Sequence, residues 1–154
     1  MKNIASQGLD GSPGEYLPVE NVIARWGKAS TAGFAAVPNA LIHSQGELKL
    51  TSNDMVVVLN LLSHWWYGKR TPFPSSALIA KRSGLGVRTV QRCLKHLQRE
   101  GLIKPVLRPE GGTRYEMDGL VEAVSEKAMA HEWRRGGTEE RLKDLEIGWI
   151  DQRL

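Results

Sequence analysis

The chain has only one cysteine, Cys93, so no disulfide can form within it. Its four histidines are far apart in sequence, and no cluster of cysteine and histidine has the spacing that metal ligands require. We therefore expect no metal, no other cofactor and a reducing compartment. Because Cys93 falls among apolar helix positions, we interpret it as a buried packing residue rather than a redox sensor.

Long apolar runs are also missing. The longest nearly apolar stretch, 55–62, contains Asn60 and is far shorter than the 18 or more residues of a membrane span. The first 16 residues hold no apolar stretch like that of a secretory signal. We expect a protein that does not cross a membrane and remains in the cytoplasm, in contact with the nucleoid or a plasmid.

Positive charge is concentrated in one segment of the chain. Residues 69–114 hold 11 Lys and Arg against two Asp and Glu, a net charge of +9, whereas the whole chain has only +4. Such a block favours a polyanionic partner, with double-stranded DNA as the leading candidate. A solvated basic surface without a partner is the alternative.

The residues divide into three predicted parts. Residues 1–33 form an accessory or poorly ordered arm, because four Gly and two Pro interrupt any period within the first 30 or so residues. Residues 34–118 form the main domain, and residues 119–154 form a helical extension.

In the main domain, Thr51 and Asp54 resemble a capping box that begins a first core helix. The predicted buried face of this helix consists of Met55, Val58, Leu59, Leu62 and Trp66.

Two further helices flank a glycine-containing turn. Ser75 or Ser76 is placed to cap a short helix over 77–81, and the sequence SGLG then ends it. A longer helix follows over 87–100, with Gly101 as its C-terminal cap. Two helices joined in this way are typical of a helix-turn-helix, whose second helix meets the DNA groove.

The second helix has one apolar and one basic face. At about 100° per residue, Val90, Cys93, Leu94 and Leu97 share a side that we expect to face the core. Four cations lie opposite, and no acidic residue interrupts them. These four, called the cation face below, are Arg88, Arg92, Lys95 and Arg99.

The position of each residue along the helix predicts its contact. The candidates for reading base edges lie near the start of the helix, and those for the DNA backbone lie farther along it or at the preceding helix. A solvated helical face is again the alternative. The base-reading candidates are Val87, Arg88, Thr89, Gln91 and Arg92, and the backbone candidates are Ser75, Ser76, Lys81, Lys95 and Arg99.

The run LIKPVLRPEGGTRYEM predicts a β-hairpin that turns at 108–112. Lys104, Arg108 and Arg114 on it are candidates for the DNA backbone or the minor groove. The segment FPSSALIAKRSGLGVRTVQRCLKHLQREGLIKP resembles the signature of bacterial winged helix-turn-helix proteins, including replication-initiator-like proteins and small transcriptional regulators of plasmids and phages. One departure is Gly86, where that family has a Ser that caps the recognition helix.

The resemblance implies a mainly α fold with a small β-hairpin wing (α+β), a winged helix-turn-helix with a C-terminal helical extension. In that extension Leu142, Leu145, Trp149 and Ile150 form an apolar seam. This seam predicts either a homodimer, which suits paired DNA half-sites, or packing within one chain.

Three functions fit these features. The leading one is a sequence-specific transcriptional regulator that represses by occupying a promoter. The second is a plasmid or phage replication-initiation or partition protein that binds repeated sites, and the third is a winged-helix module for protein interaction. We expect no enzyme, because the sequence has no glycine-rich phosphate loop, HExxH or GxSxG. Nothing in the sequence locates a small-molecule effector.

Overall fold

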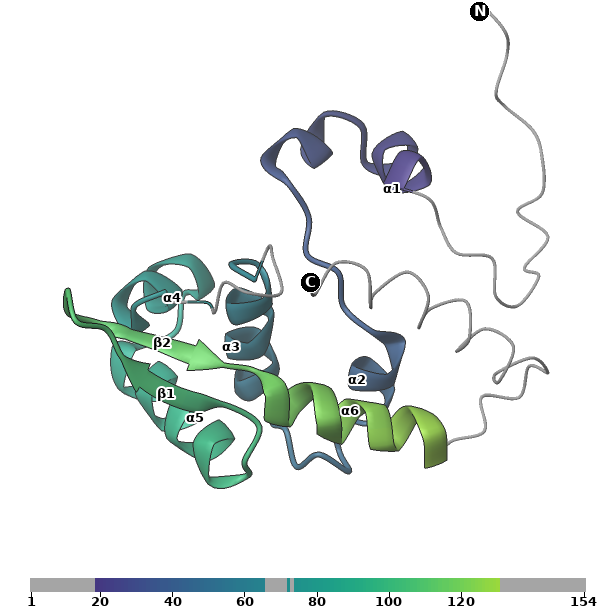
Figure 1. The fold of residues 1–154 in the computed structure, drawn as a ribbon. Coiled ribbons are helices and arrows are strands. Elements are labelled where there is room, and N and C mark those ends of the chain that lie inside the picture. Colours follow the sequence, from purple (N-terminus) through teal and green to yellow (C-terminus); the bar gives the residue numbers. More distant parts are fainter. Residues whose placement is uncertain (1–18, 66–71, 73, 131–154) are drawn as a thin grey trace, which may run out of the picture. The chain divides into compact units, whose positions relative to one another are not determined.

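The computed structural model describes residues 19–65, 72 and 74–130 of the chain (Figure 1). The chain divides into two compact units, of which the second is Ala32–His131. In the first unit, helix α1 covers Val19–Trp26, and the 3-10 helix η1 follows over Gly27–Ala32 and ends at the first residue of the second unit. Ile23 and Trp26 of α1 are exposed.

The second unit is a winged helix-turn-helix, which confirms the predicted fold class. Four helices precede a two-stranded antiparallel hairpin, and a further helix follows it. The expected division at 118/119 falls at the start of this last helix. The elements are α2 (Asn39–His43), α3 (Ser52–Leu62), α4 (Ser76–Ser83), α5 (Val87–Arg99), β1 (Lys104–Leu107), β2 (Thr113–Glu116) and α6 (Asp118–Ala130).

Helix α3 begins at the predicted capping box. The Thr51 side chain accepts from the Asp54 amide, and the Asp54 carboxylate accepts from the Thr51 amide. The predicted buried face was partly wrong, because Val57 and Leu61 are fully buried whereas Leu59 is exposed. Apolar residues occupy most of this helix, so periodicity alone could not choose the face, and the packing of α3 against α5 decides it.

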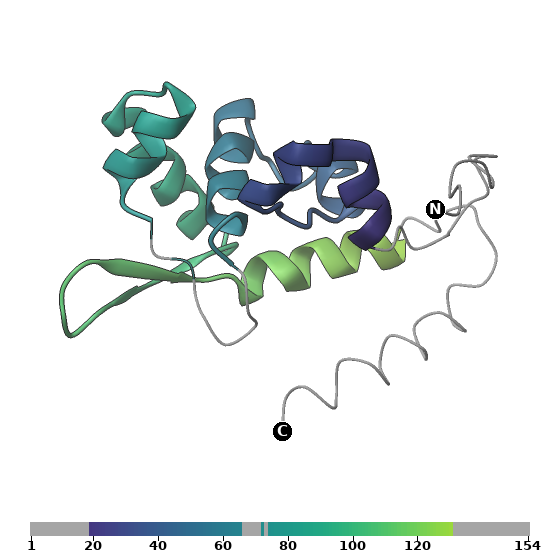
Figure 2. The same ribbon diagram turned by 90° about the horizontal axis from the view of Figure 1, so that it is seen from above.

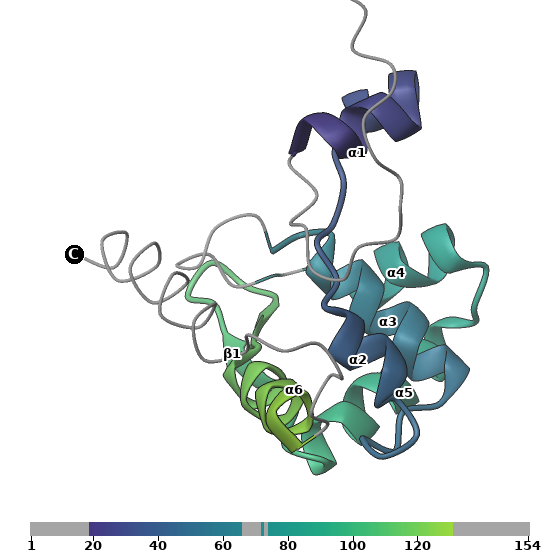
Figure 3. The ribbon, with the colours of Figure 1, turned by 90° about the vertical axis from the view of Figure 1, so that its right-hand side faces the viewer.

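The core lies where α3, α4 and α5 meet (Figure 3). The predicted apolar face of α5 is buried there, as is Ile79 of α4. Burying one such aliphatic side chain contributes about 1.5–3 kcal/mol, so this cluster holds α5 against the body of the unit.

The hairpin and α6 complete the unit. Lys104 pairs with Glu116 and Leu107 with Thr113, so the hairpin turns at the predicted residues. The Tyr115 amide donates to the Pro72 carbonyl at 2.8 Å, which ties the segment before α4 to β2. Helix α6 runs beside α2 (Figure 2) and buries Leu120 and Val124 in the core.

Candidate nucleic-acid interface

The turn between α4 and α5 is built from local hydrogen bonds. Ser75 caps α4, because its Oγ accepts from the Leu78 amide at 3.1 Å. Gly84 ends α4 in the left-handed region at φ 73°, a conformation that glycine adopts without steric cost, and its amide donates to the Ala80 carbonyl. Gly86 then begins α5 without a side-chain cap.

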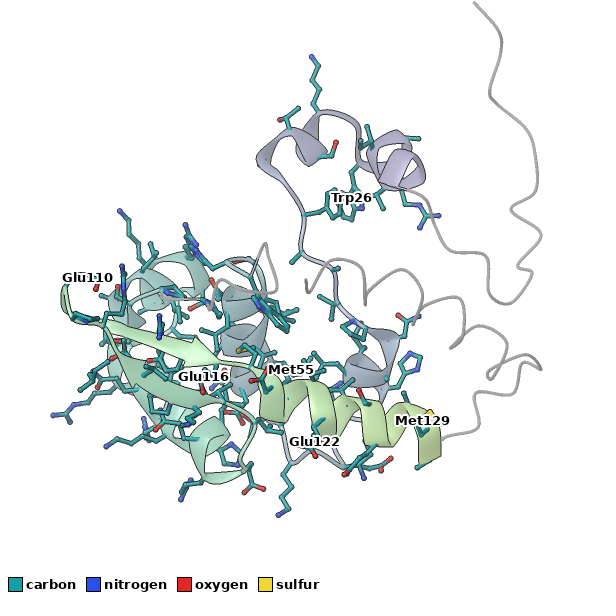
Figure 4. All side chains as sticks on the ribbon, in the orientation of Figure 1. Trp26, Met55, Glu110, Glu116, Glu122 and Met129 are labelled. Carbon is teal, nitrogen blue, oxygen red and sulfur yellow. The ribbon has the colours of Figure 1, made fainter. Side chains whose placement is uncertain are left out.

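Helix α5 has the two faces that its sequence predicts. Val90, Cys93, Leu94 and Leu97 are buried. All four residues of the cation face are exposed, and they project from the opposite side of the helix. Nitrogen-tipped side chains surround the part of the molecule that holds α4, α5 and the hairpin (Figure 4).

The cation face has no internal neutralising partner among the described residues. The sequence holds no Asp or Glu between Asp54 and Glu100. Glu100 is paired elsewhere, with its Oε2 3.1 Å from the Lys49 Nζ and its Oε1 3.8 Å from the His96 Nε2. Four unpaired cations on one side of a helix repel each other modestly, and a bound polyanion would relieve that repulsion.

The other predicted contact residues lie at the two ends of α4 and along α5. Lys81, Val87 and Gln91 are exposed, whereas Ser76 and Thr89 are half-buried. Ser75 is exposed, but its oxygen already caps α4. The two serines thus lie at the start of α4 and Lys81 lies in its last turn, while the base-reading candidates lie in the first turns of α5.

The hairpin differs more from its prediction than α5 does, because its cations form ion pairs. Two of its three predicted cations have acidic partners, since Lys104 Nζ lies 3.6 Å from Glu116 Oε2 and Arg108 is paired with Glu110. Glu110 lies at the hairpin tip (Figure 4). Hydrogen bonding at its own backbone and to Arg108 lowers the pKa of Glu110, so this carboxylate is charged at neutral pH. Arg114 is exposed on β2.

Sequence reasoning missed three features near this surface. Leu107 at the end of β1 is 83% exposed, which a strand pattern does not reveal. Arg82 donates to His64 Nε2 at 2.6 Å, and burial together with the charge of Arg82 lowers the pKa of His64. His96 contacts Asp54, which lies 42 residues away in the sequence, so no local motif predicts the pair.

Three further expectations concern a metal site, a membrane span and the dimerisation residues. Within the described ranges, no group of three or more His, Cys, Asp or Glu residues could hold a metal ion. No described helix is long and apolar enough to cross a membrane. The four predicted dimerisation residues, 142, 145, 149 and 150, lie outside the described part of the chain.

Comparison with solved structures supports the fold. The N-terminal domain of the DnaD protein from Geobacillus kaustophilus HTA426 is 23% identical, with 71% of this chain and 89% of that chain covered and a TM-score of 0.52. The S. aureus MepR-DNA complex is 17% identical, with 75% and 90% covered and a TM-score of 0.43. The YusO protein from Bacillus subtilis is 15% identical, with 89% and 95% covered and a TM-score of 0.42. The first of these shows a shared fold.

Comparison of the sequence with known families identifies the helix-turn-helix segment of the chain. No curated protein sequence matches the chain. Residues 48–103 match the family model of a helix-turn-helix domain, which covers about a third of the chain and includes α3, α4 and α5. This match agrees with the expectation of a binding protein rather than an enzyme. The matched segment and the hairpin that follows it make residues 48–116 a winged helix-turn-helix unit.

Proposed function

We propose that the protein binds double-stranded DNA at specific sequences and represses transcription by occupying a promoter. The observation that carries this proposal is the cation face of α5, which is exposed, unpaired among the described residues and placed directly after a helix-turn-helix turn. An α-helix about 10–12 Å across fits a major groove about 12 Å wide. Phosphates on both walls of that groove would then neutralise the cations.

The position of each side chain along α5 indicates whether it would read a base or contact the DNA backbone. Arg88 and Gln91 lie in the first turns and suit paired hydrogen bonds to guanine and adenine. Lys95 and Arg99 lie farther along the helix and suit phosphates. Exposed Val87 adds an apolar surface for a thymine methyl group.

The hairpin extends the interface beyond the major groove. Arg114 is exposed and forms no ion pair within 4 Å among the described residues, although its charge helps to lower the pKa of Glu110, so it is the hairpin cation best placed to meet the backbone or the minor groove. Lys104 and Arg108 would first have to leave their partners Glu116 and Glu110. Exposed Leu107 supplies apolar contact to sugar or base edges in the same region.

The proposed binding form is a dimer. Two copies would read the halves of an inverted repeat, held together through the apolar seam of residues 142–150. Packing of that seam within one chain remains the alternative, and a replication or partition role would instead use direct repeats.

The proposal is tested by selecting bound fragments from a random DNA pool. The stoichiometry of the complex is then measured on the enriched sequence. An inverted repeat bound by two chains supports the repressor proposal, whereas direct repeats bound in arrays favour replication or partition. An absence of both enrichment and salt-dependent binding would overturn DNA binding and favour a protein-interaction module.

Arg88→Ala and Gln91→Ala test the base-reading assignment. Each should weaken binding to the selected site by about 1–3 kcal/mol more than it weakens binding to random DNA. The matched control is Lys127→Ala, which removes one cation from α6, where it pairs with Glu47. Equal losses on selected and random DNA would refute base reading.

A further inference from the structure

A buried polar contact joins the start of α3 to α5, inside an interface that is otherwise apolar. His96 Nδ1 lies 2.9 Å from Asp54 Oδ2, and the Asp54 side chain is only 3% exposed. The same Asp54 oxygen accepts from the Thr51 amide at 2.9 Å and from the Thr51 hydroxyl at 2.6 Å. The buried Cys93 thiol also hydrogen-bonds to Asp54. The carboxylate is thereby held by the α3 cap and by two residues of α5.

A second set of polar contacts lies one turn farther along the chain, at the C-terminal end of α5. Glu100 contacts Lys49, which precedes α3, and it also lies near the other ring nitrogen of His96. His96 is therefore placed between two carboxylates that approach from the α3 side and from its own helix. These contacts lie next to the cation face, because His96 is roughly 40° from Arg92 and 60° from Arg99 around the helix axis.

Apolar packing and hydrogen bonds constrain a helix differently. Apolar contacts are not directional, so Val90, Leu94 and Leu97 hold α5 in place while tolerating a small rotation about its axis. A hydrogen bond to a charged group is directional, so it tolerates little rotation of the helix. A rotation of about 20° would move a side chain at the helix surface by about 2 Å, given a radius of about 5–6 Å. That displacement exceeds the distance range of a hydrogen bond to a base edge.

We propose that the Asp54–His96 hydrogen bond sets the rotation of α5 about its axis, which makes His96 a positioning residue for base recognition. His96 itself touches no DNA in this proposal. The inference rests on the proposed function for its consequence in DNA recognition, but the rotation of α5 is measurable without DNA.

The experiment compares three full-length variants with the wild type. His96→Leu removes the donor, whereas His96→Asn can present its side-chain nitrogen where His96 has Nδ1. Gln98→Leu is the matched control, because it makes the same kind of change at a half-buried position of α5 whose side chain does not hydrogen-bond to Asp54. If His96→Leu fails to fold, His96→Gln replaces it, since its longer side chain displaces the donor.

Two readouts are taken for each variant. The first is the set of amide chemical shifts of residues 87–91 in the free protein. The second is the ratio of affinities for the selected duplex and a scrambled duplex, which a simple loss of folded protein leaves unchanged because it lowers both affinities equally. His96→Leu should move the amide shifts and reduce the ratio at least about fivefold, the lower end of what one base contact contributes. His96→Asn should restore both, and Gln98→Leu should change neither.

Each outcome decides a different point. Unmoved amide shifts in His96→Leu, or an unchanged affinity ratio despite weaker binding, would overturn the positioning role. A wild type that shows no preference for any duplex would refute the proposed function instead, and the amide shifts alone would then show whether His96 sets the rotation of α5.

Discussion

Gly119 lies at the start of α6, in close contact with the turn that follows α5. A Cβ at this position would be 1.9 Å from the Gly101 carbonyl oxygen and 3.1 Å from its carbon. Both atoms belong to the backbone, so no side-chain rotation relieves the clash. The absence of a side chain is thus required for α6 to pack where it does.

We predict that Gly119→Ala lowers the free energy of unfolding by about 1–3 kcal/mol or more, because overpacking displaces backbone. Gly46→Ala is the control, since a Cβ there meets nothing within 4 Å. It should be neutral or stabilising by up to about 1 kcal/mol. Urea unfolding of both variants measures the difference, and equal stabilities would contradict the close approach of the two backbones.

Cys93 provides a second test at the scale of one residue. Burial, together with the hydrogen bond to Asp54, raises the pKa of this thiol to about 11. Because only the thiolate reacts quickly, we expect native protein to resist a chromogenic thiol reagent at neutral pH and unfolded protein to react at once. Rapid labelling of the native protein would show that Cys93 is accessible and would contradict its packing role.

At the scale of elements, α5 begins without a side-chain cap. Gly86 has φ −69° and ψ 145°, which suit a serine, and an added Cβ would meet only Thr89 Oγ1 at 3.9 Å. Gly86→Ser should raise the free energy of unfolding by about 0.5–1 kcal/mol, from the new cap and the lower entropy of the unfolded chain. Gly84→Ser should do the opposite, because Gly84 has a positive φ. Thermal unfolding of the two variants separates these cases.

The hydrogen-bonded contact of Asp54 between α3 and α5 makes the stability of the fold depend on pH. Burial alone would raise the pKa of Asp54, but hydrogen bonds from Thr51, His96 and Cys93 outweigh it and hold the pKa below its ordinary value. The stability from this carboxylate is therefore fully present above about pH 4, the pKa of an unfolded Asp, and is lost as the pH falls through the folded value.

Removing the charge should remove this pH dependence. We expect Asp54→Asn to be less stable than the wild type at neutral pH and the difference to shrink as the pH falls below about 4. Glu122→Gln is the control, because Glu122 is exposed on α6 and makes no ion pair or side-chain hydrogen bond among the described residues. Unfolding curves across this pH range measure the effect, and a difference that stays constant would show that Asp54 does not titrate with folding.

At the scale of the whole molecule, charge is divided between elements. Helices α4 and α5 contain no acidic residue, whereas α6 carries Asp118, Glu122 and Glu126. The described part of the second unit therefore has a basic side suited to phosphate, while the acidic residues of α6 are kept on a separate element.

This division predicts how DNA binding responds to salt. Lys95→Ala and Arg99→Ala should each reduce the slope of log affinity against log salt by about 1, because each removes one phosphate contact. Lys127→Ala changes net charge equally but should leave the slope unaltered. Titrations of one duplex at several salt concentrations provide the slopes, and a uniform reduction in all three variants would assign the effect to net charge rather than to α5.

Much of the central unit was predictable from sequence because its signals are local. The capping box at Thr51, the glycine turn before α5, and the opposed apolar and basic faces of α5 all depend on residues a few positions apart. The same holds for the hairpin turn, where two consecutive glycines adopt positive φ. Such patterns follow from helix and strand geometry alone.

Tertiary packing decided what no local pattern contains. It selected Val57 and Leu61 as the buried face of α3 among many apolar neighbours, and it brought His96 to Asp54 across 42 residues. The register of the hairpin pairs Lys104 with Glu116, and Arg108 pairs with nearby Glu110, which leaves the cation face of α5 as the main unpaired basic surface of the described residues. The physical reason is that burial and ion pairing depend on distances between elements, whereas sequence periodicity reports only the shape of each element by itself.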